Sequence, residues 1–191
     1  MIDFLWNLDL AVFKFINQTL SYPWLDQLTP WLTDLNETLA FKIIFPLLFF
    51  VLFIRKYKRA GITYFIFLIL SVSVSDFVGG KVKKIVLRPR PFQVVEAQTI
   101  HKAEAKANRS FYSNHSSNMF TLATYTSSFF PAGKIIFYGV ATIIALTRVH
   151  TGVHFPSDIL MGAFAGIFWG FIFSRMVKII VNKSGYGKPH S

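Results

Sequence analysis

The stretch TRVHTGVHFPSD, from Thr147 to Asp158, places an arginine, two histidines and an aspartate in a chain that is otherwise strongly apolar. Ionisable groups at membrane depth are costly, and they are retained there mainly where they serve a function. Two questions follow from this stretch: what scaffold surrounds it, and which distant residues join Arg148, His150, His154 and Asp158. The answers predict both the fold and the chemistry.

The composition around this stretch is that of a membrane protein. Of the 191 residues, 53% are hydrophobic and 22 are phenylalanine. This apolar share exceeds the roughly 45–50% that is usual for soluble domains. The net charge of +11 would suit nucleic acid or anionic lipid phosphate, and the hydropathy favours lipid, so we expect no nucleic-acid partner. The chain has no cysteine, which excludes disulfides, zinc–thiolate sites and iron–sulfur clusters.

Five apolar stretches organise the chain, at about 38–54, 60–75, 116–131, 135–147 and 159–174. Several are shorter than the roughly 20 residues that cross a bilayer, so we expect their helices to extend into the flanking polar residues. The predicted fold is all-α, an integral membrane helical bundle of about five to six transmembrane helices. We expect a single membrane-embedded domain over residues 1–181 and a flexible tail at 182–191.

The N-terminal twenty residues, MIDFLWNLDLAVFKFINQTL, do not read as a secretory signal, because no basic leader precedes their apolar part. Their apolar residues recur at helical spacing, which predicts an amphipathic helix lying in the membrane interface. The next segment, LSYPWLDQLTPWLTDLN, has two prolines and acidic residues and is also predicted to be interfacial. Trp6, Trp24 and Trp31 suit the aromatic belt of a membrane protein.

Five spans bring the long segment 76–115 and the short turn after Thr147 to the same membrane face. The opposite face receives RKYKR (Arg55–Arg59), PAGK (Pro131–Lys134) and the basic tail. Because that face carries basic residues and no acidic ones, we place it in the cytoplasm. The expected location is the inner (plasma) membrane of a bacterium, with the active site on the extracytoplasmic side.

Three groups of polar residues thus meet at the ends of spans on one face, which is the arrangement of a catalytic site. They are Lys83 with Arg90-Pro91, the run Ser113-Asn114-His115, and Arg148 with His154 and Asp158. His150, His154 and Asp158 also have a spacing that could ligate zinc. Nearby cations, among them Arg148, would oppose a dication. We therefore expect no metal, and an anion as ligand.

Phosphate fits such a site, because arginine offers planar paired donors to its oxygens and lysine adds a point charge. Ser113 is predicted to cap a helix whose N-terminus would present backbone N–H groups to the phosphate. Asp158 could then hold one ring nitrogen of His154 and leave the other free to attack phosphorus. His115 could protonate the departing oxygen, and no cofactor is required.

These residues resemble the signature of the type 2 phosphatidic acid phosphatase superfamily, which also contains the vanadium haloperoxidases. The resemblance implies that His154 is the nucleophile that forms a phosphohistidine, that Asp158 is its partner and that His115 is the leaving-group acid. It assigns phosphate binding to Lys83, Arg90, Ser113, Asn114 and Arg148.

The chain departs from the family pattern in the middle motif, which usually reads Pro-Ser-Gly-His and here reads Tyr112-Ser113-Asn114-His115. Asparagine tolerates unusual backbone dihedrals and brings its own donor. The first motif also admits a second register, Lys81 with Arg88-Pro89. The doubled Arg-Pro favours the register of Lys83 with Arg90, and it leaves Arg88 and Lys81 as accessory candidates.

The resemblance implies a membrane lipid phosphatase that acts on a phosphate monoester or diphosphate of a lipid headgroup. Candidate substrates are undecaprenyl diphosphate, lipid A 1-phosphate and phosphatidylglycerophosphate, with EAQTIHKAEAK (96–106) as a candidate lid. Two alternatives are a vanadium-dependent haloperoxidase, although those enzymes are soluble and longer, and a catalytically silent lipid-binding or lipid-moving protein. The oligomeric state is not predicted.

Three residues or groups outside the motifs have structural interpretations. Asp76 is expected to pair with a nearby lysine or arginine. Gly162, Gly166 and Gly170 are expected to allow close helix packing within the monomer. His150 is interpreted as a peripheral contact.

Overall fold

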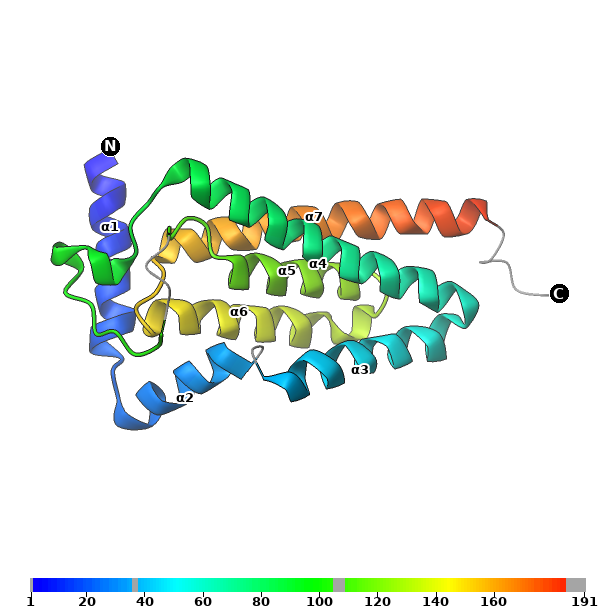
Figure 1. Cartoon of the computed structure of the whole chain (residues 1–191), viewed down its shortest axis with the longest axis horizontal. Coiled ribbons are helices and arrows are strands. Elements are labelled where there is room, and N and C mark those ends of the chain that lie inside the picture. The colour runs from blue at the N-terminus through cyan, green and yellow to red at the C-terminus, as the bar shows by residue number, and fades with distance from the viewer. Residues whose placement is uncertain (1, 36–37, 105–108, 185–191) are drawn as a thin grey trace.

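The computed structural model describes residues 2–35, 38–104 and 109–184, and this part of the chain is built from helices and their connections, without strands. Each of the five apolar stretches forms a helix, and most of these helices extend beyond the stretch into polar residues (Figure 1). The all-α bundle is therefore confirmed. The five helices are α3 (Leu39–Tyr57), α4 (Arg59–Val86), α5 (Asn114–Ser127), α6 (Lys134–His150) and α7 (Pro156–Lys183).

The length and apolar character of the helices identify the membrane spans. Within the described residues, three segments could cross a membrane on these grounds: Arg59–Gln93, Pro131–His150 and Pro156–Lys183. A fourth is added if α2 (Pro23–Asp34) and α3 form one bent span. Helix α5 has only 14 residues and a buried face of serines and threonines, and it packs against α4, α6 and α7.

The helices alternate in direction, so that their connections gather at the two ends of the bundle (Figure 1). The segments 87–104, 109–113 and 151–155 lie at one end, together with α2 and the N-terminal helix α1 (Ile2–Lys14). The α3–α4 and α5–α6 turns and the end of α7 lie at the other. The predicted convergence of the three motifs is therefore confirmed. Helix α7 continues to Lys183, and residues 185–191 of the expected tail lie outside the described part.

Helix α1 lies across the end of the bundle that holds the α6–α7 loop, and it is amphipathic, as predicted (Figure 1). One face is exposed, with Phe4, Leu5 and Leu8 more than half accessible. The other face packs on the protein: Phe13 is fully buried, and the ring of Trp6 lies 5.2 Å from that of Phe155. A short π-helical turn (Phe15–Thr19) then leads to α2.

Close packing of α7 on α5 fixes the relative position of two motifs. A Cβ atom added at Gly166 would lie 2.2 Å from the carbonyl oxygen of Ser117, so only glycine permits this approach. The same relation holds at Gly162, 2.6 Å from the Ser113 oxygen. The predicted packing of the glycine stripe within the monomer is confirmed. It holds the start of α7, which carries Asp158, against the start of α5.

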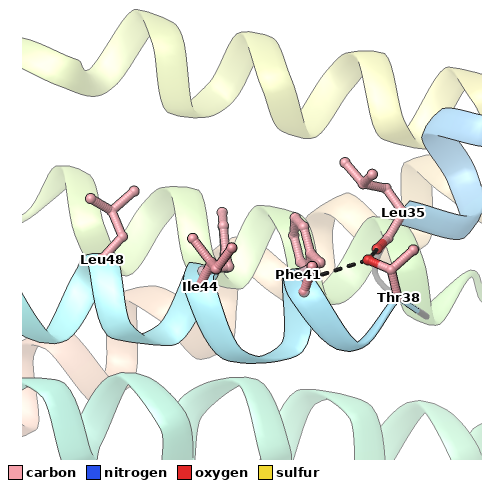
Figure 2. A pocket seen from close by; sticks show the side chains of 7 residues that line it. Leu35, Thr38, Phe41, Ile44 and Leu48 are labelled. Atoms are coloured by element: carbon pink, nitrogen blue, oxygen red, sulfur yellow. Dashed lines mark hydrogen bonds between the residues drawn. The ribbon is translucent and has the colours of Figure 1, made fainter.

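The opening turns of α3 stand apart from the bundle and form an apolar groove. Phe41, Ile44 and Leu48 project from the same side of α3, and Leu35 closes one end of the row (Figure 2). Thr38 caps α3 by accepting a hydrogen bond from the Phe41 backbone N–H at 3.2 Å. The groove begins at the end of α2 and runs along the first turns of α3 (Figure 1).

Candidate active site

His154 sits in the tight loop Thr151–Phe155 that joins α6 to α7. Gly152 has a φ of +80°, and a Cβ atom there would lie 2.5 Å from the side chain of Thr99. The backbone N–H groups of Val153 and His154 both donate to the Arg148 carbonyl at 3.1 Å. The imidazole is almost completely buried. The loop thus holds the ring in one place, and the segment 99–102 packs against the start of the loop.

Asp158, the third residue of α7, has both carboxylate oxygens engaged. Its Oδ2 accepts from the Phe155 backbone N–H at 2.8 Å and from the hydroxyl of Ser110, and it lies 3.5 Å from Nδ1 of His154. Its Oδ1 accepts from Arg88 at 2.7 Å. The carboxylate is fully buried, so its partners determine its orientation. Asp158 therefore lies beside His154, on the Nδ1 side of the ring.

The second nitrogen of His154 faces cations. Nη1 of Arg90 lies 3.4 Å from Nε2 and donates to the Val153 carbonyl at 2.8 Å. Burial lowers the pKa of His154 to about 3, although the neighbouring Asp158 carboxylate opposes that shift. The ring is therefore neutral at physiological pH. In the tautomer that carries its proton on Nδ1, beside Asp158, Nε2 would hold a lone pair on the side of Arg90.

The remaining motif residues converge on the same place. His115, the second residue of α5, is within electrostatic range of Lys83, Arg90, Arg148 and His154. Arg148 is only 5% exposed, and its Nε atom has no hydrogen-bond acceptor among the described residues. A buried guanidinium nitrogen of this kind needs an acceptor, such as an anion oxygen.

The middle motif starts α5 in the predicted way. Ser113 has an extended backbone, and its hydroxyl accepts from the Ser116 N–H at 3.4 Å, so it is the N-cap. The side chain of Asn114 turns to α4 instead of the cation cluster: its amide donates to Oδ1 of Asp76 at 3.0 Å. A Cβ at Gly79 of α4 would lie 2.4 Å from the Asn114 Oδ1, so Asn114 fills the space beside this glycine.

Asp76 does not bear out its expected pairing with a lysine or arginine. Its Oδ1 accepts from the side-chain amides of Asn114 and, at 2.9 Å, of Asn118. Asp76 is exposed, and its Oδ1 reaches from α4 to two amides on the first turns of α5. The amides of Asn114 and Asn118 therefore tie α5 to α4.

The two accessory candidates lie in different places. Lys81 is exposed, with its ammonium 5.1 Å from the ring of Phe77. Arg88 lies behind Asp158 and contacts Asp9 of α1 at 2.6 Å. Asp9 and Ser110 were missed as site residues. The available signal for Asp9 was its position three residues after Trp6 and four before Phe13, a charge on the packed face of an amphipathic helix.

His150 is a buried structural centre, contrary to its interpretation as a peripheral contact. Its Nδ1 lies 2.8 Å from the Thr29 hydroxyl, and its Nε2 lies 3.1 Å from the Leu20 carbonyl oxygen. Lys102 approaches Nε2 at 3.4 Å. Both ring nitrogens of His150 thus contact α2, the segment just before it or the long loop, whereas His154 faces Asp158. No group of three potential metal ligands occurs among the described residues.

The sequence that carries this site matches a known protein family. Residues 62–181 match the family model described as "PAP2 superfamily". The chain belongs to the PAP2 superfamily. The match includes all three motifs and the helices α4 to α7 that carry them. The PAP2 protein is accordingly an integral membrane lipid phosphatase whose chemistry is independent of metal ions.

Two related proteins have names that describe a phosphatase activity. The chain is 31% identical to the "Putative undecaprenyl-diphosphatase YbjG" of Escherichia coli over 84% of its own length and 78% of the relative's. It is 26% identical to a lipid A 1-phosphatase of Rhizobium johnstonii over 62% of its own length. The alignment covers only 48% of that longer relative.

Two solved structures share the fold. A transmembrane PAP2-type phosphatidylglycerolphosphate phosphatase from Bacillus subtilis superposes with a TM-score of 0.74 at 20% identity, over 92% of this chain and 87% of that one. LpxE of Aquifex aeolicus superposes with a TM-score of 0.70 at 28% identity, over 88% and 95%. The likeness covers nearly the whole length of each chain.

Proposed function

We propose that this PAP2 protein removes phosphate from a lipid headgroup through a covalent intermediate on His154. The observation that carries the proposal is the position of the imidazole between opposite charges. Nδ1 lies 3.5 Å from Asp158 Oδ2, and Nε2 lies 3.4 Å from Arg90 Nη1. A phosphate bound by Arg90 would meet the lone pair on Nε2. The carboxylate on the far side would stabilise the positive charge that develops on the ring.

The proposed phosphate ligands surround that nitrogen. The buried guanidinium of Arg148 supplies a donor, Nε, that has no acceptor among the described residues. Burial strengthens such charge-assisted hydrogen bonds, because water does not compete for the anion. The side chain of Asn114 is held by α4, so its proposed contribution is through the backbone at the N-terminus of α5. The full set is Lys83, Arg90, Ser113, Asn114 and Arg148.

The reaction proceeds in two displacements. Nε2 of His154 attacks phosphorus, an N–P bond forms, and the bond from phosphorus to the lipid oxygen breaks. His115 donates a proton to that oxygen. Water then attacks the phosphohistidine and gives a proton to His115. The N–P bond breaks, and inorganic phosphate leaves with His154 restored.

Undecaprenyl diphosphate is the substrate that we propose first, ahead of lipid A 1-phosphate and phosphatidylglycerophosphate. The relative named for it aligns over most of both chains. The apolar groove at Leu35 and along α3 would hold the start of the hydrocarbon chain (Figure 2). The hydroxyls of Thr33 and Thr147 are 2.7 Å apart, so the end of α2 lies beside Arg148. The groove therefore begins near the proposed phosphate site.

Phosphate release from purified protein tests this function. The panel contains the three lipids, a water-soluble short-chain phosphate and the His154→Ala variant as a negative control. We expect the highest kcat/KM for undecaprenyl diphosphate and no release by His154→Ala. Ile44→Trp should raise KM for the long-chain substrate alone, whereas the exposed α6 residue Ile136 offers a matched Ile136→Trp control. Failure to turn over any lipid phosphate would refute the proposal.

We further propose that the protein resides in the bacterial inner membrane with the site on the extracytoplasmic side. The support is the distribution of charge between the two ends of the bundle. The α3–α4 turn, with Arg55–Arg59, and the α5–α6 turn, with Lys134, lie at the end of the bundle opposite the α6–α7 loop (Figure 1), and neither turn has an acidic residue. Cations resist export across the membrane, which favours keeping that end in the cytoplasm.

A further inference from the structure

Asp9 links the N-terminal helix to the first turn of α7. Its Oδ1 accepts from the Ser157 backbone N–H at 2.8 Å, and its Oδ2 accepts from the Ser157 hydroxyl at 2.6 Å. The first N–H groups of a helix lack partners within the helix, so a carboxylate from α1 here caps α7 from outside. Asp9 is thereby bound to Ser157, the residue that precedes Asp158 in α7.

Arg88 connects this carboxylate to the catalytic one. Its Nη2 donates to Asp9 Oδ2 at 2.6 Å, and its Nη1 donates to Asp158 Oδ1 at 2.7 Å. The guanidinium carbon lies 4.3 Å from the centroid of the Phe155 ring, which covers one face of the group. Arg88 is thus held between two carboxylates, on the side of Asp158 away from His154.

We propose that Asp9 is a positioning residue of the phosphatase reaction, which acts through Arg88 on Asp158 and so on the His154 ring. The inference rests on the proposed function of His154. It gives Arg88 a role different from phosphate binding, because both of its terminal nitrogens are directed at carboxylates. It also makes the N-terminal helix part of the catalytic apparatus.

The physical reason is the balance of charge around Asp158. As Nε2 bonds to phosphorus, positive charge develops on the imidazole, and Asp158 stabilises it. Without Asp9, the positive charge of Arg88 would be paired with Asp158 alone. It would then weaken the attraction between Asp158 and the charged imidazole. Asp9 shares the Arg88 charge and holds the guanidinium in place, so that Oδ2 of Asp158 remains available to Nδ1. Loss of Asp9 should therefore raise the barrier to the chemical step and leave substrate binding intact.

The test compares the steady-state kinetics of full-length variants in detergent micelles with undecaprenyl diphosphate. Asp9→Asn should lower kcat by roughly 10- to 100-fold, the usual range when a supporting hydrogen-bond partner is lost, with KM changed less than twofold. Asp9→Glu, which retains the charge, should keep more activity than Asp9→Asn. Asp3→Asn, on the exposed side of the same helix, is the matched control and should match wild type.

A double-mutant cycle separates positioning from folding. Because Asp9 is inferred to act through Arg88, adding Asp9→Asn to Arg88→Gln should cost less than twofold beyond Arg88→Gln alone. Ser157→Ala removes the hydroxyl contacts to Asp9 and to Arg88 Nη1 but leaves both Arg88–carboxylate contacts, so it should reduce stability more than kcat. An equal loss from Asp9→Asn in both backgrounds, or a loss confined to KM, would overturn the inference.

The same data distinguish the two proposals. An active wild type whose kcat is unaffected by Asp9→Asn would refute the positioning role alone. A wild type that releases no phosphate from any lipid of the panel would refute the proposed function, and the positioning role with it.

Discussion

Asp158 meets His154 and Arg88 on different oxygens: Oδ2 lies 3.5 Å from the His154 Nδ1, and Oδ1 lies 2.7 Å from the Arg88 Nη1. The carboxylate that we propose orients the nucleophile is thus itself held by a cation. Asp158→Asn should keep the shape of the side chain and remove its charge. We expect kcat to fall by roughly 10²- to 10⁴-fold with little change in KM, as when the carboxylate partner of a catalytic histidine is neutralised. Steady-state kinetics near wild type would show that His154 does not depend on this charge.

The buried His154 should make folding stability depend on pH. Its pKa is lowered from the ordinary 6.5 to about 3, so between these values the unfolded chain binds a proton that the folded chain does not. The free energy of unfolding should then fall as pH drops through this window, by up to about 1.4 kcal/mol per pH unit. His154→Ala lacks this contribution. The difference in Tm between wild type and His154→Ala should therefore shrink from pH 7 to pH 4.5, and a constant difference would contradict the pKa shift.

Asn114 should contribute to stability rather than to phosphate affinity through its side chain. Its amide joins α5 to α4 by donating to Asp76 Oδ1 at 3.0 Å. Asn114→Ala should lower the free energy of unfolding by about 1–2 kcal/mol, with KM changed less than threefold. Asp76→Ala should lower the free energy of unfolding by a similar amount. Because both residues belong to one contact, the double variant should be no less stable than the less stable of the two single variants. A tenfold rise in KM at unchanged stability would instead place the side chain on the substrate.

Labelling of cysteines tests which side of the membrane carries the site. The native chain has no cysteine, so the background is clean. Val95, 88% exposed in the long loop, should react as Val95→Cys with a membrane-impermeant thiol reagent in intact cells. Ala132→Cys, in the α5–α6 turn, should react only after the membrane is opened. The reverse pattern would place the active site in the cytoplasm.

Much of the fold followed from local patterns in the sequence. Apolar stretches predicted five helices, and Ser113 predicted the start of α5, because hydropathy and capping depend on neighbouring residues. The glycine stripe of α7 predicted close packing, and a Cβ at Gly166 would indeed lie 2.2 Å from the backbone of α5. The polar character of α5 was underestimated. A helix that other helices surround need not be apolar, provided that its hydroxyls bond within the bundle.

The parts of the site that sequence did not reveal depend on contacts between distant segments. Asp9 and Arg88 are 79 residues apart, and His150 and Thr29 are 121 residues apart. No local motif encodes these pairs, because one joins α1 to the segment after α4 and the other joins α2 to the end of α6. Asp76 was assigned the wrong kind of partner for the same reason. Its partners, Asn114 and Asn118, lie on α5, and periodicity within a mostly apolar helix does not reveal a contact with another helix.

Capture of the covalent intermediate tests the central claim most directly. Purified protein is mixed with undecaprenyl diphosphate labelled in its terminal phosphate, quenched within the first turnovers, and digested for mass spectrometry. We predict a label that is stable to alkali and labile to acid, located on the peptide that carries His154 and missing from His154→Ala. Labelling at another residue, or phosphate release by His154→Ala at the wild-type rate, would contradict the mechanism.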